Sequence, residues 1–211
     1  MKKIKILSTR KLNKDLRHLF DDLKFDFYQD DFISIQPLKF NLPEHNGSWI
    51  FTSKNIDKFF KKIYCVGENT KSLLIKKGQK ITKMAQNSSI LADFISKTAK
   101  NEEFIFCRSD IKNEEFSIFF KKKNIKLKEL VVYNNIAEPV KYNQVFDAIL
   151  FYSPSGIKSF MTNNSLNNSY CICIGKTTSK YVNQYSDKVL CCKVPTIENV
   201  IRKTIKLFNN D

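Results

Sequence analysis

The chain has 211 residues, 42% of them hydrophobic, and its net charge of +15 comes from 36 Lys and Arg against 21 Asp and Glu. No apolar run is long enough to span a bilayer, and the opening Met1–Leu7 alternates like a strand and lacks a signal-peptide core, so we expect a soluble cytoplasmic protein without a membrane partner. The six cysteines form no CxxC pair and His18 and His45 lie far apart, which excludes zinc and Cys/His chemistry from our expectations.

Nine short apolar runs predict strands, and helical patterns fill most of the gaps between them. In chain order the strands are expected at Lys5–Ser8, Asp31–Gln36, Ser48–Thr52, Ile63–Val66, Glu103–Cys107, Lys128–Tyr133, Ala148–Tyr152, Tyr170–Ile174 and Lys188–Cys192. Strands that alternate with helices are typical of parallel sheets with crossover helices. The sequence therefore predicts an α/β fold.

Two parts of the chain resemble each other at the ends of these strands. Phe51-Thr52-Ser53 and Phe151-Tyr152-Ser153 both end a strand with Phe-x-Ser. In each half a glycine follows the next strand, and a threonine stands three residues beyond it, at Thr70 and Thr178. This internal repeat predicts two similar units. A weaker echo relates Ile6–Arg10 to Ile105–Ser109, where each strand ends near a hydroxyl or thiol and a cation.

Hydroxyl and amide side chains at strand-to-helix junctions have two interpretations. They can cap the helix by accepting hydrogen bonds from its first amides, or they can help the helix N-terminus and the strand ends to bind an anion. The chain has no GxGxxG or GxxxxGK[ST] motif, so the anion need not be a nucleotide. Ser153-Pro154-Ser155-Gly156 also lacks a downstream histidine, which excludes a serine hydrolase.

The strand-end motifs together resemble the uroporphyrinogen-III synthase family. The chain carries, in family order, an opening Thr9-Arg10, FTSxN at 51–55, VGxxT at 66–70, Val132-Tyr133, FxSPSG at 151–156, IGxTT at 174–178 and Pro195-Thr196. The resemblance implies two parallel-sheet α/β domains, flavodoxin-like halves, joined by a two-stranded β linker with a cleft between them. The first domain would be residues 1–36 with 136–211, the second 38–130, and the linker strands about 31–36 and 128–135.

The resemblance also implies a cofactor-free lyase of haem biosynthesis. Its substrate would be hydroxymethylbilane, a linear tetrapyrrole with eight carboxylates, which loses water and closes to uroporphyrinogen III through a spiro intermediate that inverts ring D. The same substrate can close unaided to the uninverted isomer, so the protein must chiefly control conformation. We expect it to act as a monomer and to receive the substrate by transient contact with hydroxymethylbilane synthase.

Family resemblance assigns roles to ten residues. Tyr133 matches the tyrosine that assists departure of the hydroxyl group, although an aromatic residue packed in a linker strand is an alternative. Substrate-binding positions are matched by Arg10, Ser53, Asn55, Thr70, Ser153, Ser155, Gly156, Thr177 and Thr178. Arg10 could equally form a structural salt bridge or cap the end of a neighbouring helix.

Two other functions stay open at this point. A two-domain protein of this kind could bind an anionic small molecule without converting it. The charge of +15 could also serve nucleic-acid binding, but the lysines are spread along the chain rather than gathered in a basic arm or recognition helix, so no nucleic-acid partner is expected.

Overall fold

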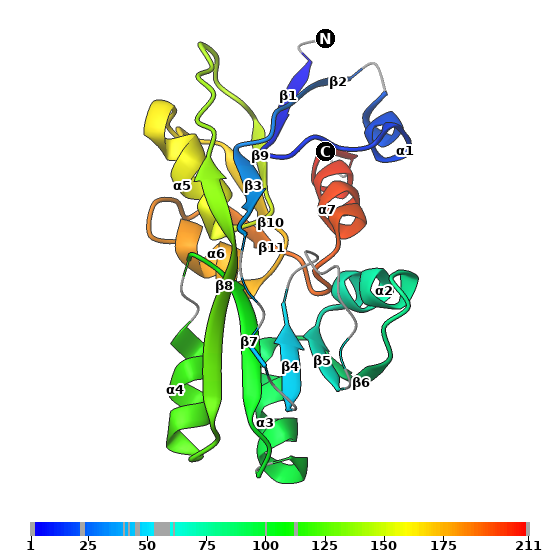
Figure 1. Cartoon of the computed structure of the whole chain (residues 1–211). Helices are drawn as coiled ribbons and strands as arrows, with labels where there is room; N and C mark the ends of the chain where they lie inside the picture. The colour runs from blue at the N-terminus through cyan, green and yellow to red at the C-terminus, as the bar shows by residue number, and fades with distance from the viewer. Residues whose placement is uncertain are drawn as a thin grey trace. The chain divides into compact units, whose positions relative to one another are not determined.

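The computed structural model of the chain (Figure 1) consists of two compact units. It describes residues 3–21, 24–39, 41, 43–44, 47–52, 60, 62–99, 101–111 and 114–209. Unit 1 comprises Met1–Ser34 and Ile136–Asp211, and unit 2 comprises Ile35–Asn135. The chain therefore passes between the units inside two strands, β3 (Ile33–Pro37) and β8 (Leu127–Ala137).

Unit 1 contains a five-stranded sheet in the order β11-β10-β9-β1-β2, and every neighbouring pair of strands is parallel. The strands are β1 (Ile4–Ser8), β2 (Phe25–Gln29), β9 (Ala148–Phe151), β10 (Tyr170–Cys173) and β11 (Val189–Cys191). The helices are α1 (Lys14–Arg17), followed by the 3-10 turn η1 (His18–Phe20), α5 (Pro154–Asn163), α6 (Lys176–Val182) and α7 (Ile197–Asn209).

Helices cover both faces of the unit 1 sheet, as Figure 1 shows. Leu7, Ile149 and Phe151 pack with α5 and α6 on one face, and their neighbours Ile6 and Leu150 pack with α7 on the other. Because both faces are buried, the central strands β9 and β10 are continuous apolar runs rather than alternating ones.

Unit 2 contains a six-stranded sheet in the order β3-β8-β7-β4-β5-β6. Its further strands are β4 (Ser48–Phe51), β5 (Ile63–Val66), β6 (Ile81–Ala85) and β7 (Phe104–Ser109), and its helices are α2 (Glu68–Lys76), α3 (Ser88–Thr98) and α4 (Glu114–Lys122). On one face of the sheet the core forms between the strands and helices α3 and α4. On the other face it forms between the strands and α2.

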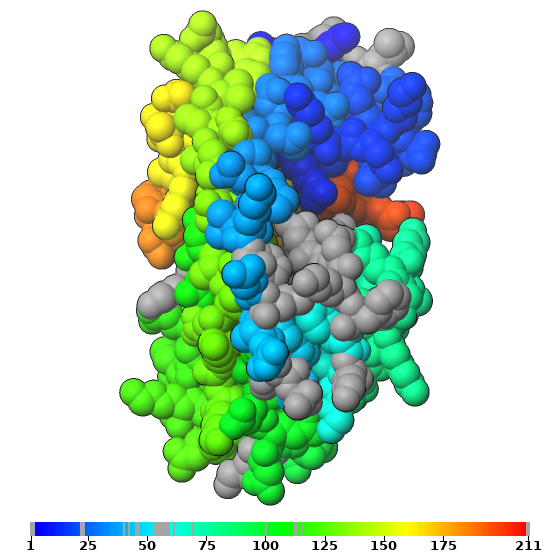
Figure 2. Space-filling view, in the orientation of Figure 1, coloured from blue at the N-terminus to red at the C-terminus, as the bar shows by residue number. Residues whose placement is uncertain are grey.

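The strands β4 to β8 of this sheet are parallel, whereas β3 runs antiparallel to β8. The backbone N–H of Leu38 donates to the carbonyl of Val132, and that of Glu138 donates to Phe32, so residue numbers rise on one strand as they fall on the other. Most of β3 is exposed, and its atoms lie at the surface in Figure 2.

The α/β fold with parallel sheets is confirmed, and each of the nine predicted strands overlaps an observed one. Sequence analysis missed β2 and β6, which form sheet edges and carry polar residues such as Asp26 and Lys83. A half-exposed edge strand lacks the apolar run by which the central strands were recognised. Among the described residues, no helix is long and apolar enough to cross a membrane.

Candidate functional site

Parallel strands bring most of the predicted residues to one edge of each sheet, where the strands end. In unit 1 this carboxyl edge carries Ser153, which begins α5 and accepts a hydrogen bond from the backbone N–H of Gly156 at 3.1 Å. Thr9, just after β1, donates to the carbonyl of Leu150 at 2.7 Å. A Cβ on Gly156 would lie 3.5 Å from Ser153 Oγ and 3.6 Å from Thr9 Oγ1, so the two segments pack closely. Ser155 is half-buried in the first turn of α5.

The segment that carries Arg10 is held by the end of β2. The N–H of Lys11 donates to Asp31 Oδ1 at 2.9 Å, and the N–H of Leu12 donates to Gln29 Oε1 at 2.9 Å. Ser8 Oγ donates to the Arg10 carbonyl at 2.5 Å. The Arg10 residue is exposed, and within the described residues its side chain forms no ion pair or hydrogen bond. The guanidinium is thus free to meet an anion.

Tyr152 belongs to the same edge, and sequence analysis did not single it out. Its hydroxyl lies 3.2 Å from Ser8 Oγ. Burial raises the pKa of Tyr152 to about 12, although the hydrogen bond with Ser8 and the nearby Arg10 act in the opposite direction. The phenol therefore stays neutral near pH 7. The available signal was its place between Phe151 and Ser153 in the strand-end motif.

Helix α6 begins at Gly175 without a side-chain cap. Thr177 is exposed in its first turn, whereas Thr178 is only 4% exposed. The hydroxyl of Thr178 forms no hydrogen bond within the part of the chain that the structure describes. Among the described residues only Ser159 Oγ is a fully buried side-chain oxygen without a partner, so the Thr178 oxygen itself reaches solvent and is open to a ligand.

Unit 2 repeats this arrangement at its own carboxyl edge. Helix α2 begins at Gly67, whose φ of 84° lies in the region that favours glycine, and it too has no side-chain cap. The N–H of Gly67 donates to Ala85 at 2.9 Å, which anchors the turn on β6. Thr70 is 6% exposed, and among the described residues its hydroxyl has no hydrogen-bond partner.

Tyr133 lies at the same edge of unit 2, where its backbone pairs with Ser109 at the end of β7. Its carbonyl accepts a hydrogen bond from the N–H of Asp110 at 3.0 Å, and its half-buried ring packs against a cluster that includes Phe51 and Cys107. No hydrogen bond to its hydroxyl occurs within the described residues. The ring is therefore fixed while the phenol remains available. Ser53 and Asn55 lie outside the described residues.

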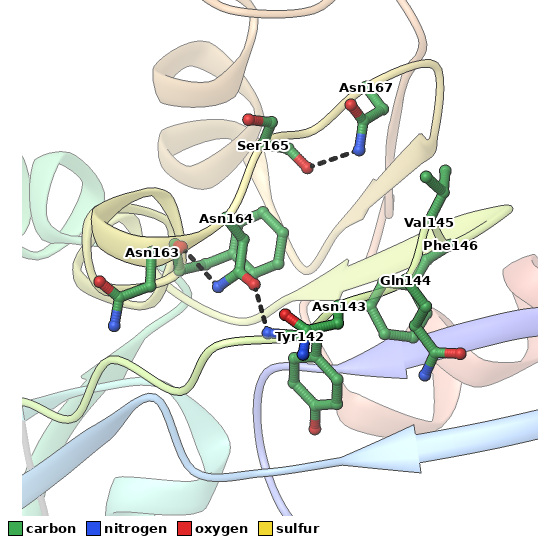
Figure 3. Close-up of a pocket in the computed structure, with 10 residues that line it drawn as sticks. Tyr142, Asn143, Gln144, Val145, Phe146, Asn163, Asn164, Ser165 and Asn167 are labelled. Carbon is green, nitrogen blue, oxygen red and sulfur yellow. Dashed lines mark hydrogen bonds between the residues drawn. The ribbon is translucent and has the colours of Figure 1, made fainter.

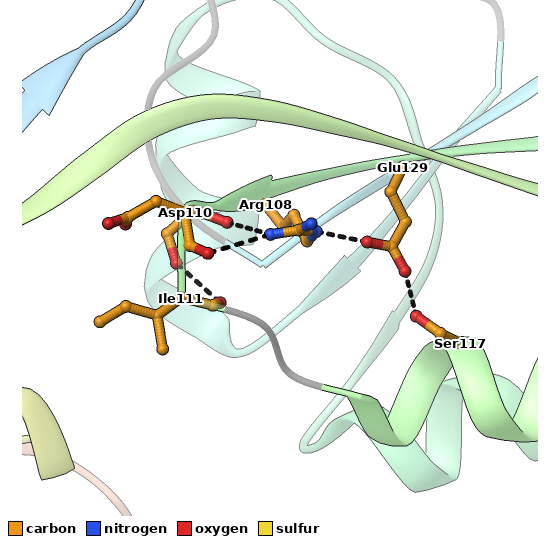
Figure 4. A network of polar contacts seen from close by, with 6 residues as sticks. Arg108, Asp110, Ile111, Ser117 and Glu129 are labelled. Carbon is orange, nitrogen blue, oxygen red and sulfur yellow. Dashed lines mark hydrogen bonds and ion pairs between the residues drawn. The ribbon is translucent and has the colours of Figure 1, made fainter.

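Arg108 is bound into the structure, unlike Arg10 (Figure 4). Its Nε lies 2.5 Å from Glu129 Oε2, and its guanidinium also donates to the carbonyl of Ser109 at 2.7 Å. Ser117 of α4 donates to the other oxygen of Glu129. The Arg108 side chain is only 11% exposed. The sequence similarity between the segments that carry Arg10 and Arg108 therefore does not extend to the contacts that the two side chains make.

All six cysteines are free, and five of them are buried. Burial raises the pKa of the Cys65 thiol to about 11 and that of the Cys107 thiol to about 12, so both stay protonated near neutral pH. In the described part of the chain, no group of three His, Cys, Asp or Glu side chains is placed to hold a metal ion.

A polar pocket of about 290 Å³ lies at the opposite, amino edge of the unit 1 sheet (Figure 3). It is lined by Tyr142, Asn143, Gln144, Val145, Phe146, Phe160, Asn163, Asn164, Ser165 and Asn167. The central Asn164 is fully used by the protein, since it donates to the carbonyls of Val140 and Phe160 and accepts from the N–H of Tyr142. None of the predicted site residues lines it, so the carboxyl edges remain the better candidates.

Comparison with known proteins places the chain beside tetrapyrrole enzymes. The family model described as uroporphyrinogen-III synthase HemD matches residues 36–202. A uroporphyrinogen-III synthetase from Helicobacter pylori superposes with a TM-score of 0.66 at 18% identity, over 98% of this chain and 100% of that chain. A mutant uroporphyrinogen III synthase from the extremely thermophilic bacterium Thermus thermophilus gives a TM-score of 0.62 at 8% identity, over 99% and 100%. No curated protein sequence matches significantly.

Proposed function

The chain belongs to the uroporphyrinogen-III synthase family, and we propose that it closes hydroxymethylbilane to uroporphyrinogen III with groups at the carboxyl edges of its two sheets. The family match covers residues 36–202 and therefore includes most of both units. The reaction releases water from the hydroxymethyl group, forms a spiro intermediate and inverts ring D. It requires control of substrate conformation more than a reactive nucleophile.

The observation that carries this proposal is a pair of buried residues, Thr70 and Thr178, whose hydroxyls reach solvent and have no partner among the described residues. Each stands three residues after the glycine that begins its helix, and each is less than a tenth exposed. A hydrogen bond to a substrate carboxylate would satisfy such a hydroxyl, and bonds to charged groups are the stronger kind. The same positions are the ones that family resemblance assigns to substrate binding.

Tyr133 is the proposed catalytic residue. As the C–O bond of the hydroxymethyl group breaks, the phenol transfers its proton to the departing oxygen, which leaves as water, and the tyrosinate regains a proton when ring D loses one on ring closure. The pyrrole that remains is a cationic azafulvene, which the already substituted carbon of ring D attacks. A neutral phenol suits this step because it adds no positive charge beside the developing cation.

The other proposed binding residues divide into direct contacts and supports. Arg10 offers a charged group, and Ser155 and Thr177 offer hydroxyls that are half-buried and exposed, respectively. Ser153 already caps α5, so it and Gly156 act by shaping the start of that helix. Roles for Ser53 and Asn55 rest on family resemblance alone. The net charge of +15 would speed the approach of a substrate with eight carboxylates.

The protein is further proposed to act as a monomer in the cytoplasm. Its high net charge disfavours self-association. Because hydroxymethylbilane closes unaided, a transient handover from hydroxymethylbilane synthase would limit its loss.

The product isomer tests the proposed function. The protein is incubated with freshly generated hydroxymethylbilane, the products are oxidised, and the porphyrin isomers are separated. Isomer III is expected in excess over a protein-free control, which should contain isomer I. Isomer I alone in both samples would refute the function.

A further inference from the structure

A second cavity of about 290 Å³ lies in unit 1 and has a strongly basic lining. This cavity, called here the basic pocket, is lined by Cys192, Lys193, Val194, Asn199, Arg202, Lys203 and Lys206. Four of these seven residues are cationic and none is acidic, although the whole chain has 21 acidic residues against 36 basic ones. The pocket therefore concentrates positive charge beyond the average of the chain.

Helix α7 supplies one wall of the basic pocket. Asn199, Arg202, Lys203 and Lys206 follow one another at helical spacing and so share one stripe of the helix. The adjoining Val200 and Ile201 are fully buried against the sheet, as part of the core on that face. This packing fixes the basic stripe in place, and atoms of α7 reach the surface in Figure 2, where they are red.

The four cations of the basic pocket are unpaired in the part of the protein that the structure describes. Within these residues, the side chains of Lys193, Arg202, Lys203 and Lys206 form no ion pair or hydrogen bond. Glu198 stands four residues before Arg202 on α7, but no ion pair joins them. Arg202 and Lys206 also stand four residues apart on α7, and like charges at this spacing repel each other. Lys206 is favoured by its place in the last turn of the helix, but that effect does not extend to the others.

The basic pocket adjoins the carboxyl edge of the unit 1 sheet, because Cys192 directly follows β11. The N–H of Cys192 donates to the carbonyl of Cys173 at 3.0 Å, just before the turn that begins α6. A Cβ on Gly175 would lie 3.6 Å from the Cβ of Pro195. The segment between β11 and α7 thus joins the pocket to the turn that positions Thr178.

We propose that the basic pocket binds the carboxylates of one pyrrole ring of the linear tetrapyrrole, a ring that takes no part in bond formation. This assignment rests on the proposed function. Ammonium and guanidinium groups bind carboxylates through charge-assisted hydrogen bonds. The volume of about 290 Å³ is at the small end of ligand sites, which span roughly 300–1,000 Å³, so it fits one substituted ring rather than the whole substrate.

Binding at a remote ring has a kinetic signature. Contacts that are equally strong in the ground state and the transition state lower KM and leave kcat unchanged. Loss of the basic pocket should therefore weaken substrate binding without slowing the chemical step. It should also flatten the salt dependence of binding, because screened charge pairs are removed.

The test compares two double variants that each remove two positive charges. Arg202→Gln/Lys203→Gln alters the basic pocket, and Lys76→Gln/Lys122→Gln alters exposed lysines of α2 and α4 that do not line it. The pocket variant should raise KM for hydroxymethylbilane about tenfold at low salt with kcat unchanged, and the control should change KM less than about twofold. A third variant, Arg202→Lys/Lys203→Arg, keeps both positive charges and should have the KM of the unaltered protein.

Binding of uroporphyrin, a stable octacarboxylate, provides a second measurement that does not require turnover. Its Kd, followed by fluorescence, should rise about tenfold in the pocket variant and fall back in the charge-conserving variant. Equal Kd and KM changes in the pocket and control variants would overturn the pocket proposal while isomer III still forms. If the unaltered protein forms only isomer I, the proposed function fails, and the uroporphyrin measurement alone still decides whether the pocket binds polycarboxylates.

Discussion

The carboxyl edges of the two sheets share an order of elements, a strand, a glycine and a helix, but differ in their side-chain chemistry. Each edge has a helix that begins at a glycine and carries a buried threonine, Thr178 in unit 1 and Thr70 in unit 2. In unit 1 the arginine is free and the tyrosine is hydrogen-bonded, whereas in unit 2 the arginine is paired and the tyrosine hydroxyl has no partner within the described residues. The comparison indicates that the proposed binding hydroxyls are duplicated, while the free cation and the free phenol are divided between the units.

The largest expected effect separates the two tyrosines. Tyr133→Phe should slow formation of isomer III about 100-fold, because it removes the donor to the leaving oxygen but keeps the ring that packs against Phe51. Tyr152→Phe should leave the rate within about twofold and cost about 1 kcal/mol of stability, since it loses only the hydrogen bond with Ser8. Initial rates and thermal unfolding measure both. An unchanged rate in Tyr133→Phe would remove this residue from the mechanism.

The two arginines should respond in opposite ways. Arg108→Gln should lower the free energy of unfolding by about 2 kcal/mol, because Glu129 loses its cation in a partly buried setting. Arg10→Gln should leave stability unchanged and raise KM severalfold, because its side chain has no partner in the described structure. Denaturant unfolding and steady-state kinetics give the two values. A stability loss in Arg10→Gln would favour the salt-bridge alternative for that residue.

The threonines should respond alike. Thr178→Val and Thr70→Val keep the shape of the side chain and remove a hydroxyl that has no partner among the described residues, so the free protein should be as stable as before or slightly more stable. Each change should raise KM about tenfold, the value of a hydrogen bond to a charged group. Melting temperature and KM are measured together. A lower melting temperature with unchanged KM would show that the hydroxyl is structural.

The smallest expected effect concerns the serine that caps α5. Ser153→Ala removes the bond to the N–H of Gly156 and should cost about 1 kcal/mol of stability. Its KM should change less than that of Thr178→Val, because this hydroxyl is already used by the helix. Thermal unfolding and KM of the two variants decide the order. A larger KM change in Ser153→Ala would reverse the division between capping and binding.

The repeat allowed the sequence to predict where polar groups lie, because residues that follow parallel strands must share an edge. The glycine-to-threonine spacing placed Thr70 and Thr178 correctly at strand-to-helix turns. It gave no means of telling a free side chain from a bonded one. The partner of Arg108 is Glu129, on the neighbouring strand and 21 residues away, and nothing in the arginine motif indicates it.

The remaining gaps have physical causes too. Strands β2 and β6 escaped notice because edge strands expose polar residues and need no continuous apolar run. The basic pocket escaped notice because its cations come from Lys193 and from a stripe of α7, and in the sequence they are no denser than lysines elsewhere. Helix geometry gathers the cations of α7 on one face, and the chain before the helix adds Lys193 to them.

The isomer composition produced by Thr70→Val/Thr178→Val tests the central claim most directly, that neutral hydroxyls at these edges control ring closure. With limiting protein, the unaltered chain should form mainly isomer III, and the double variant should release a growing share of substrate to spontaneous closure, seen as isomer I. Its kcat/KM should fall about 100-fold if the two tenfold effects combine. A double variant with the isomer ratio and kcat/KM of the unaltered protein would contradict the account.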